Sequence, residues 1–271
     1  MIIGGRTMSN TARIREKALL LNPIDDLMFR KMAENMGFCE EILQVILEDP
    51  DLTVLEAIPQ WQGTNMQGRS VILDAKCKLG AGTEVNIEVQ KPDDDNHQKR
   101  VRYNGAILTT NLTDPKTKFK DIPDVCVVFI SKSDFFKRNH AVYHVDRILR
   151  ETGELVENGF TEVYVNAAVK DDSTASRLMT VFTDSDAYSE EFPETSAQKS
   201  IYKKTEGGIQ AMCDVVKDLA KEERAEGREE TSFVMKRLLS AGRIEDAKRA
   251  ADDSKYMDQL LEEFGRKEPV H

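Results

Sequence analysis

The sequence of 271 residues lacks long apolar runs, closely spaced cysteines and any excess of positive charge. No stretch approaches the roughly 20 apolar residues that a membrane-spanning helix needs, so we expect no membrane association. The first 22 residues carry basic side chains but no compact apolar segment or cleavage-like site, which argues against a secretory signal. Cys39, Cys77 and Cys126 lie in apolar segments, as buried thiols do in a reducing compartment. We therefore expect a cytoplasmic protein.

The charge is negative overall and unevenly distributed. A net charge of −10 argues against a general nucleic-acid coat, because phosphate binding depends largely on lysine and arginine. Residues 97–102 are nevertheless basic, and lysines follow at 116, 118 and 120, whereas the region beyond about residue 184 is rich in acidic side chains. A local basic strip on an acidic protein is compatible with DNA binding but does not establish it.

Residues 23–185 have the pattern of an α/β core. A continuous apolar run that opens at Pro123 is typical of a central buried strand. Around it the periodicity predicts helices at 26–32, 38–48 and 98–112, an extended but irregular segment at 53–62, and strands at 71–79, 84–91, 123–130, 141–147 and 160–169.

The remaining chain has a helical pattern. We expect helices at 196–223, 231–240 and 244–264, with Gly242 as a C-cap between the last two. The charge run at 222–230 is either a solvated helix face or a hinge. The predicted organisation is an N-terminal extension (1–22), an α/β domain (23–185) and a helical C-terminal region (186–271), whose helices could mediate homo-oligomerisation.

The most informative stretch is the predicted hairpin at 71–91. With the turn centred near Ala81, residues whose numbers sum to 162 face each other, so Asp74 lies opposite Glu88. Directly opposed side chains have Cβ atoms about 4.5–5.5 Å apart, which places both carboxylates within reach of one cation. Gln90 follows on the same face, where it can orient a water or bind a phosphate oxygen.

Two interpretations of this polar face are open from the pattern alone. The residues are either a solvated face of an amphipathic hairpin or a metal site. Close carboxylates repel each other and raise one pKa unless a divalent cation neutralises them, and oxygen ligands suit Mg²⁺ or Mn²⁺.

Other candidate sites are weaker. His140 and His144 lie in a strand-like segment, where residues four apart are about 13 Å distant and cannot share one ion. The glycines at 80 and 82 indicate a turn, because no Gly-Lys-Ser/Thr motif follows them. Trp61 is the single tryptophan, and we expect it to pack rather than to stack on a base.

Four short motifs occur in a characteristic order. They are residues 23–31 (PIDDLMFRK), 73–74 (LD), 86–90 (NIEVQ) and 99–103 (KRVRY). In this order and spacing the chain resembles the PD-(D/E)XK nuclease superfamily, in its recombination-promoting nuclease/putative transposase branch, over roughly residues 20–185. The resemblance implies a restriction-endonuclease-like core, in which helices flank a mixed central sheet, and Mg²⁺-dependent hydrolysis of DNA phosphodiesters.

The resemblance also implies roles for individual residues. Asp74 and Glu88 would hold the metal, and the backbone carbonyl of Val89 could complete its shell. Gln90 stands where the superfamily usually has a lysine, so positive charge falls to the metal or to a cation from elsewhere in the chain. Asp26 is expected to approach the site from the first helix of the core, with a helix N-cap as the alternative. Arg100 is expected to clamp phosphate, with a surface ion pair as the alternative.

Two functions follow as hypotheses. The first is a Mg²⁺- or Mn²⁺-dependent DNA endonuclease acting on mobile elements, in recombination or in phage defence. The second is a catalytically weak or inactive nuclease fold that serves as an interaction or assembly module, which the acidic charge and the missing lysine favour. No DNA-recognition module is identifiable in the sequence.

Overall fold

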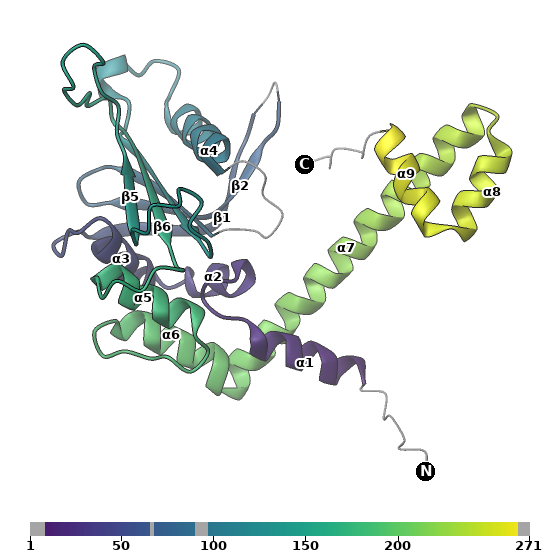
Figure 1. Cartoon of the computed structure of the whole chain (residues 1–271), viewed down its shortest axis with the longest axis horizontal. Helices are drawn as coiled ribbons and strands as arrows, with labels where there is room; N and C mark the ends of the chain where they lie inside the picture. The colour runs from purple at the N-terminus through teal and green to yellow at the C-terminus, as the bar shows by residue number, and fades with distance from the viewer. Residues whose placement is uncertain (1–8, 66–67, 90–96, 265–271) are drawn as a thin grey trace. The chain divides into compact units, whose positions relative to one another are not determined.

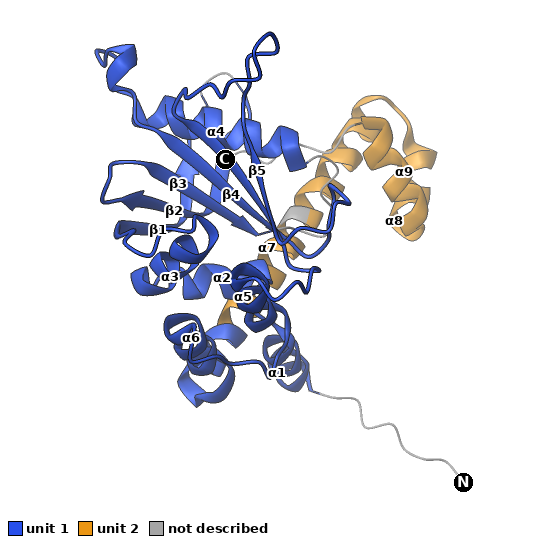
Figure 2. Ribbon diagram, turned by 60° about the vertical axis from the view of Figure 1, so that its left-hand side comes forward, with its two compact units in different colours: residues 1–213 blue, residues 214–271 orange. Residues whose placement is uncertain are grey.

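The computed structural model describes residues 9–65, 68–89 and 97–264. The chain divides into two compact units, Met1–Cys213 and Asp214–His271, which Figure 2 colours separately. The first unit is a mixed α/β structure with a central sheet flanked by helices, which confirms the predicted fold class. The domain limits expected from the sequence, at 22/23 and 185/186, stay a prediction.

A six-stranded mixed sheet forms the centre of the first unit (Figure 1). Its spatial order is β1-β2-β3-β4-β6-β5, in which β3, β4 and β6 run parallel and the other neighbours are antiparallel. The strands are β1 (Val54–Gly63), β2 (Val71–Leu79), β3 (Glu84–Val89), β4 (Val125–Ser131), β5 (Val142–Val145) and β6 (Phe160–Asn166). Strand β4 is buried along its whole length, as the apolar run opened by Pro123 predicts.

Hairpin β2–β3 has the predicted register. Lys76 faces Asn86 and Cys77 faces Val85, so paired residue numbers sum to 162. The tight turn between the strands includes Gly82, whose φ of +92° favours glycine over residues with a Cβ. The turn fixes the register, and the register places Asp74 and Glu88 at the next position beyond the last regular pair, Ala75 and Ile87.

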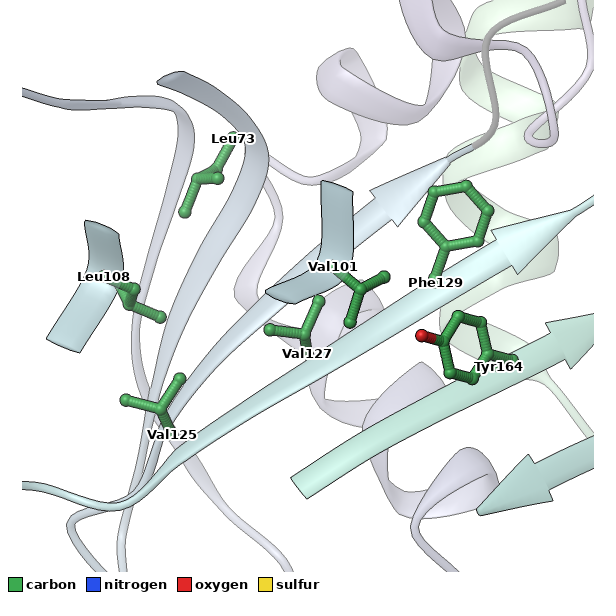
Figure 3. Close-up of a cluster of buried hydrophobic side chains, with 7 residues drawn as sticks. All are labelled: Leu73, Val101, Leu108, Val125, Val127, Phe129 and Tyr164. Carbon is green, nitrogen blue, oxygen red and sulfur yellow. The ribbon is translucent and has the colours of Figure 1, made fainter. Parts of the chain in front are cut away.

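Helix α4 (His97–Leu112) covers one face of the sheet. Val101 and Leu108 of α4 share a buried cluster with side chains of the strands beneath them (Figure 3), namely Leu73, Val125, Val127, Phe129 and Tyr164. Trp61 packs against this cluster, as expected. Gly105 permits the close approach, because a Cβ there would lie 2.2 Å from the Phe160 ring.

The other helices of the first unit lie mainly on the opposite side of the sheet (Figures 1 and 2). Phe38 of one helix stacks on Phe182 of another with ring centroids 6.0 Å apart, and Phe29 joins them at 5.7 Å from Phe38. These helices are α1 (Asn10–Leu20), α2 (Asp26–Met32), α3 (Met36–Ile46), α5 (Thr174–Thr183) and α6 (Pro193–Lys204). The sheet is therefore covered on both faces.

The second unit has a small helical core. Helix α7 (Glu206–Ser240) runs across the unit boundary, and its C-terminal part packs with α8 (Ile244–Asp252) and α9 (Ser254–Phe264). The cluster contains Val234, Leu238, Ala247, Ala250, Leu260 and Leu261. Gly242 has a φ of +71° and its N–H reaches the Leu239 carbonyl, so it terminates α7 as predicted.

Some of the expected segments are confirmed, and the boundaries of others are wrong. The segment at 53–62, expected to be extended and irregular, is strand β1 with a register shift between Val54 and Glu56, and the charge run at 222–230 lies within helix α7, as the solvated-face alternative predicts. The helix expected at 196–223 is interrupted at Thr205, and the one expected at 244–264 is interrupted at Asp253. At each break a residue with extended backbone caps the helix that follows: the Thr205 hydroxyl accepts a hydrogen bond from the Gly208 N–H at 3.0 Å, and the Asp253 carboxylate accepts one from the Tyr256 N–H at 3.2 Å.

All four cysteines are free and buried, which agrees with the expectation for Cys39, Cys77 and Cys126. Among the helices that the structure describes, none combines the length and the apolar character of a membrane span.

The close approach of Gly105 to Phe160 predicts a strict size limit on α4. We expect Gly105→Ala to lower the free energy of unfolding by about 1–3 kcal/mol, because the added methyl overpacks the interface with the sheet. The matched control is Gly207→Ala in the first turn of α7, where an added Cβ meets nothing within 4 Å and should stabilise by up to about 1 kcal/mol. Urea unfolding of both variants measures the difference, and equal effects would contradict the packing argument.

Candidate active site

Asp74 on β2 and Glu88 on β3 form hydrogen bonds between the two strands just beyond their last regular pair. The Asp74 N–H donates to Glu88 Oε1 at 3.4 Å, and the Val89 N–H donates to Asp74 Oδ2 at 2.9 Å. Each carboxylate thus accepts a hydrogen bond from the backbone of the neighbouring strand, in place of a ladder bond. The register arithmetic from the sequence predicted this juxtaposition.

Both carboxylates are removed from water. Asp74 is 1% exposed and Glu88 is 5% exposed, and the neighbouring Asn86 is fully buried. Asn86 and Glu88 pair in register with Val127 and Phe129, so their side chains point to the face that α4 covers. The interpretation of this row as a solvated face is therefore wrong, because α4 lies over it.

Burial makes ionisation of Glu88 unfavourable. It raises the pKa of Glu88 to about 8, with desolvation as the first cause and repulsion by Asp74 as the second. The Asn86 side chain, the positive charge of Arg100 and the hydrogen bond from the Asp74 backbone oppose the rise in pKa without cancelling it. At neutral pH Glu88 is mainly protonated.

Arg30, on α2, forms an ion pair with Asp74. Its guanidinium lies 3.1 Å from Asp74 Oδ1, and its Nε lies 2.6 Å from Asp26 Oδ1. Arg30 is therefore clamped between two carboxylates, and Asp26 reaches the site through it. The motif pattern did not single out Arg30, although Asp26 and Arg30 are spaced i,i+4 on one helix face, a common signal for an ion pair.

Asp26 is the first residue of α2 and Asp25 is the N-cap, so the alternative that made Asp26 the N-cap is wrong. The Asp25 carboxylate instead accepts from the Asn22 N–H at 2.8 Å and pairs with Lys132 at 2.5 Å.

The first turn of α4 approaches the site. Its first residue, His97, packs its ring 5.0 Å from that of Phe129, the residue that pairs with Glu88 in the sheet. Arg100 belongs to the same turn, and its positive charge lowers the pKa of Glu88. Gln90 lies outside the described residues, and the role of the Val89 carbonyl remains a prediction.

The described part of the chain contains no group of three or more histidine, cysteine, aspartate or glutamate side chains that could hold a metal ion. Two carboxylates do fit a hard divalent cation when backbone and water oxygens complete its shell, since Mg²⁺ usually keeps several waters and takes one or two carboxylates. The raised pKa of Glu88 shows the charge conflict that such a cation would relieve. These oxygen ligands therefore fit Mg²⁺ or Mn²⁺, provided that the Arg30 guanidinium moves away from Asp74 Oδ1 when the cation binds.

Comparison with known proteins identifies a family that includes these residues. A family model described as PD-(D/E)XK nuclease family transposase matches residues 23–176, which include Asp26, Arg30, Asp74, Glu88 and Arg100. No curated protein matches the chain significantly. No solved structure matches it either.

The raised pKa of Glu88 predicts a pH dependence of stability in metal-free protein. The unfolded carboxyl, with a pKa near 4.5, releases its proton before the folded one, with a pKa of about 8. Between these values the folded state binds the extra proton, so stability falls as pH rises, by at most about 1.4 kcal/mol per pH unit. Glu88→Gln should remove this loss.

Thermal unfolding in EDTA between about pH 5 and pH 9 measures the effect. Glu191→Gln is the control, because Glu191 is an exposed carboxylate whose pKa is lowered by Arg177. A wild-type stability that does not fall over this range would contradict the assignment of a buried, protonated Glu88.

Proposed function

The chain belongs to the PD-(D/E)XK nuclease family transposases, and we propose that it is a divalent-metal-dependent DNA endonuclease. The observation that carries the proposal is the buried pair Asp74 and Glu88, held together by hydrogen bonds to each other's strands. A protein gains no stability from two adjacent buried carboxylates that repel each other, so their placement favours a role in binding a cation.

Asp74, Glu88 and the backbone carbonyl of Val89 would hold Mg²⁺ or Mn²⁺. Bound there, the cation supplies positive charge that polarises a phosphodiester and lowers the pKa of a water molecule. The Val89 N–H fixes the Asp74 carboxylate through Oδ2, which keeps the orientation of the ligand constant. Glu88 must release its proton before it can act as a ligand, and its raised pKa makes this release depend on pH.

The cationic side chains complete the proposed site. Arg100 lies in the first turn of α4 and acts electrostatically on Glu88, and its proposed role is to bind a phosphate oxygen of the substrate. Arg30 on α2 pairs with Asp74, and Asp26 orients the Arg30 guanidinium through a 2.6 Å contact with its Nε. Gln90 is proposed to orient the attacking water, since its amide cannot supply charge. Action on mobile elements, in recombination or in phage defence within the cytoplasm remains part of this proposal.

The proposal predicts metal-dependent cleavage that requires both carboxylates. With Mg²⁺ or Mn²⁺ the wild type should cut plasmid DNA, and EDTA should abolish cutting. Asp74→Ala and Glu88→Gln should each lower the rate by more than about 100-fold, since changes even in the residues that support metal ligands cost 10- to 100-fold. Gel analysis measures the cleavage rate. Glu191→Gln, on the surface, is the matched control and should cut at the wild-type rate.

A second candidate is a nuclease fold that serves as an interaction module without catalysis. The specific observation in its favour is that Arg30 already neutralises Asp74 at 3.1 Å. Plasmid DNA left intact across salt and pH, together with no binding of Mn²⁺ in calorimetry, would overturn the nuclease proposal and favour this one.

The clamp around Arg30 predicts competition with the divalent cation. Arg30→Met should lower the metal-free stability by about 3 kcal/mol, because it leaves Asp74 buried and unpaired. The same variant should bind Mn²⁺ more tightly than the wild type, because the cation no longer displaces a guanidinium. Calorimetric titration measures the affinity, and thermal unfolding with and without Mn²⁺ measures the stability.

Arg15→Met is the control for this prediction. It removes a solvent-exposed ion pair with Glu206, so it should alter neither quantity appreciably. Unchanged or weaker Mn²⁺ binding by Arg30→Met would show that Arg30 and the metal do not compete for Asp74.

A further inference from the structure

A basic strip with one protruding aromatic ring follows the active-site helix. The strip comprises Arg102 on α4 and then Lys116, Lys118, Phe119 and Lys120, of which Phe119 and Lys120 belong to the short helix η1 (Phe119–Asp121). All five residues are exposed, and the Phe119 side chain is 94% exposed. This is the most exposed of the large apolar residues in the described part of the chain.

The cations of the strip face solvent rather than acidic side chains. Within the described residues, none of Arg102, Lys116, Lys118 and Lys120 belongs to an ion pair, although the chain carries ten more acidic than basic side chains. Exposed cations of this kind on an acidic protein favour an anionic partner, and such charge complementarity steers association.

The strip borders an open groove of about 790 Å³. Arg102, Phe119 and Lys120 line it, together with the polar side chains Thr109 and Thr110. Arg147 forms a fixed wall, because its guanidinium lies 4.9 Å from the centre of the Phe160 ring and donates to the Phe160 carbonyl at 3.1 Å. Asp124 and Glu157 also line the groove, so it suits a ligand that presents polar groups besides phosphate.

Helix α4 connects this groove to the active site. Its first residue, His97, packs on Phe129, which pairs with Glu88 in the sheet, and the groove is lined by residues from its second turn onward. The 16 residues of α4 span about 24 Å, which corresponds to about seven base pairs of duplex DNA at 3.4 Å of helix axis each. A strand whose phosphate is bound near Arg100 can therefore follow α4 as far as η1.

We propose that the basic strip binds the unpaired part of a DNA substrate, with Phe119 stacking on a base and the surrounding cations contacting phosphates. The inference rests on the proposed nuclease function and names its substrate class as DNA with a single-stranded segment several nucleotides from the scissile phosphate. Bases within a duplex stack on each other and do not expose a face to a protruding ring, whereas an unpaired base does. Aromatic rings among cations are the usual platform for single strands.

Fluorescence anisotropy with the full chain in EDTA tests the proposal without cleavage. The probes are a single-stranded oligonucleotide, a duplex with a single-stranded tail and a blunt duplex. Phe119→Ala should weaken binding of the first two about tenfold and leave the blunt duplex nearly unchanged. The double variant Lys118→Gln/Lys120→Gln should also reduce the salt dependence of single-strand binding, by about 0.7 in log–log slope for each phosphate that is no longer neutralised.

Matched variants control for exposure and charge. Leu155→Ala removes another exposed apolar side chain, and Lys236→Gln/Lys255→Gln removes two exposed lysines of the second unit, so neither should alter binding. Because Phe119 is almost fully exposed, Phe119→Ala should retain the wild-type melting temperature.

The outcomes separate the two proposals. If the wild type binds DNA and Phe119→Ala binds single strands equally well, the strip is not the binding surface, and the nuclease proposal stands. If Phe119→Ala weakens the blunt duplex as much as the tailed one, the single-strand assignment is wrong. Tighter binding of RNA than of DNA of the same sequence would overturn the choice of DNA. If the wild type binds none of the probes, the proposal for the strip fails, and the cleavage assay with Mg²⁺ or Mn²⁺ alone decides the nuclease proposal.

Discussion

The burial of two carboxylates at one position of the sheet is the constraint on which the rest of the site depends. Removing Asp74 and Glu88 from water is costly, and their proximity adds repulsion. The fold offsets this cost in three ways. Each carboxylate accepts a backbone N–H from the opposite strand, Arg30 pairs with Asp74, and Glu88 retains its proton.

The helices around the site also contribute to burying and neutralising the two carboxylates. Helix α4 excludes water from the polar row through Val101 and Leu108, and its first turn also carries Arg100. Close packing at Gly105 keeps α4 near the sheet, so that the charge of Arg100 acts on Glu88 through a medium of low dielectric. Helix α2 delivers Arg30 from a different part of the chain. The electrostatics of the site therefore depend on packing interactions that themselves carry no charge.

The sequence predicted the features that depend on interactions between residues close together in the chain. The turn near Gly82 set the hairpin register, and the unbroken apolar run marked β4 as the central strand. The burial of Glu88 could not be predicted, because alternation along β3 looks the same whether water or α4 covers the polar face. Arg30 escaped prediction for a similar reason, since its partner Asp74 is 44 positions away. Local pattern predicts which residues share a face, and only tertiary structure determines what lies over that face.

The balance of charges around the site explains why the pKa of Glu88 in particular is raised. Asp26 and Asp74 carry two negative charges, and Arg30 and Arg100 carry two positive ones, so the protonation of Glu88 determines the net charge. With Glu88 protonated the set is neutral, which suits a buried site without metal. With Glu88 ionised, one divalent cation and one phosphodiester restore neutrality. Under the proposed function, a raised pKa at this one carboxylate lets the same five side chains remain stable both without and with metal and substrate.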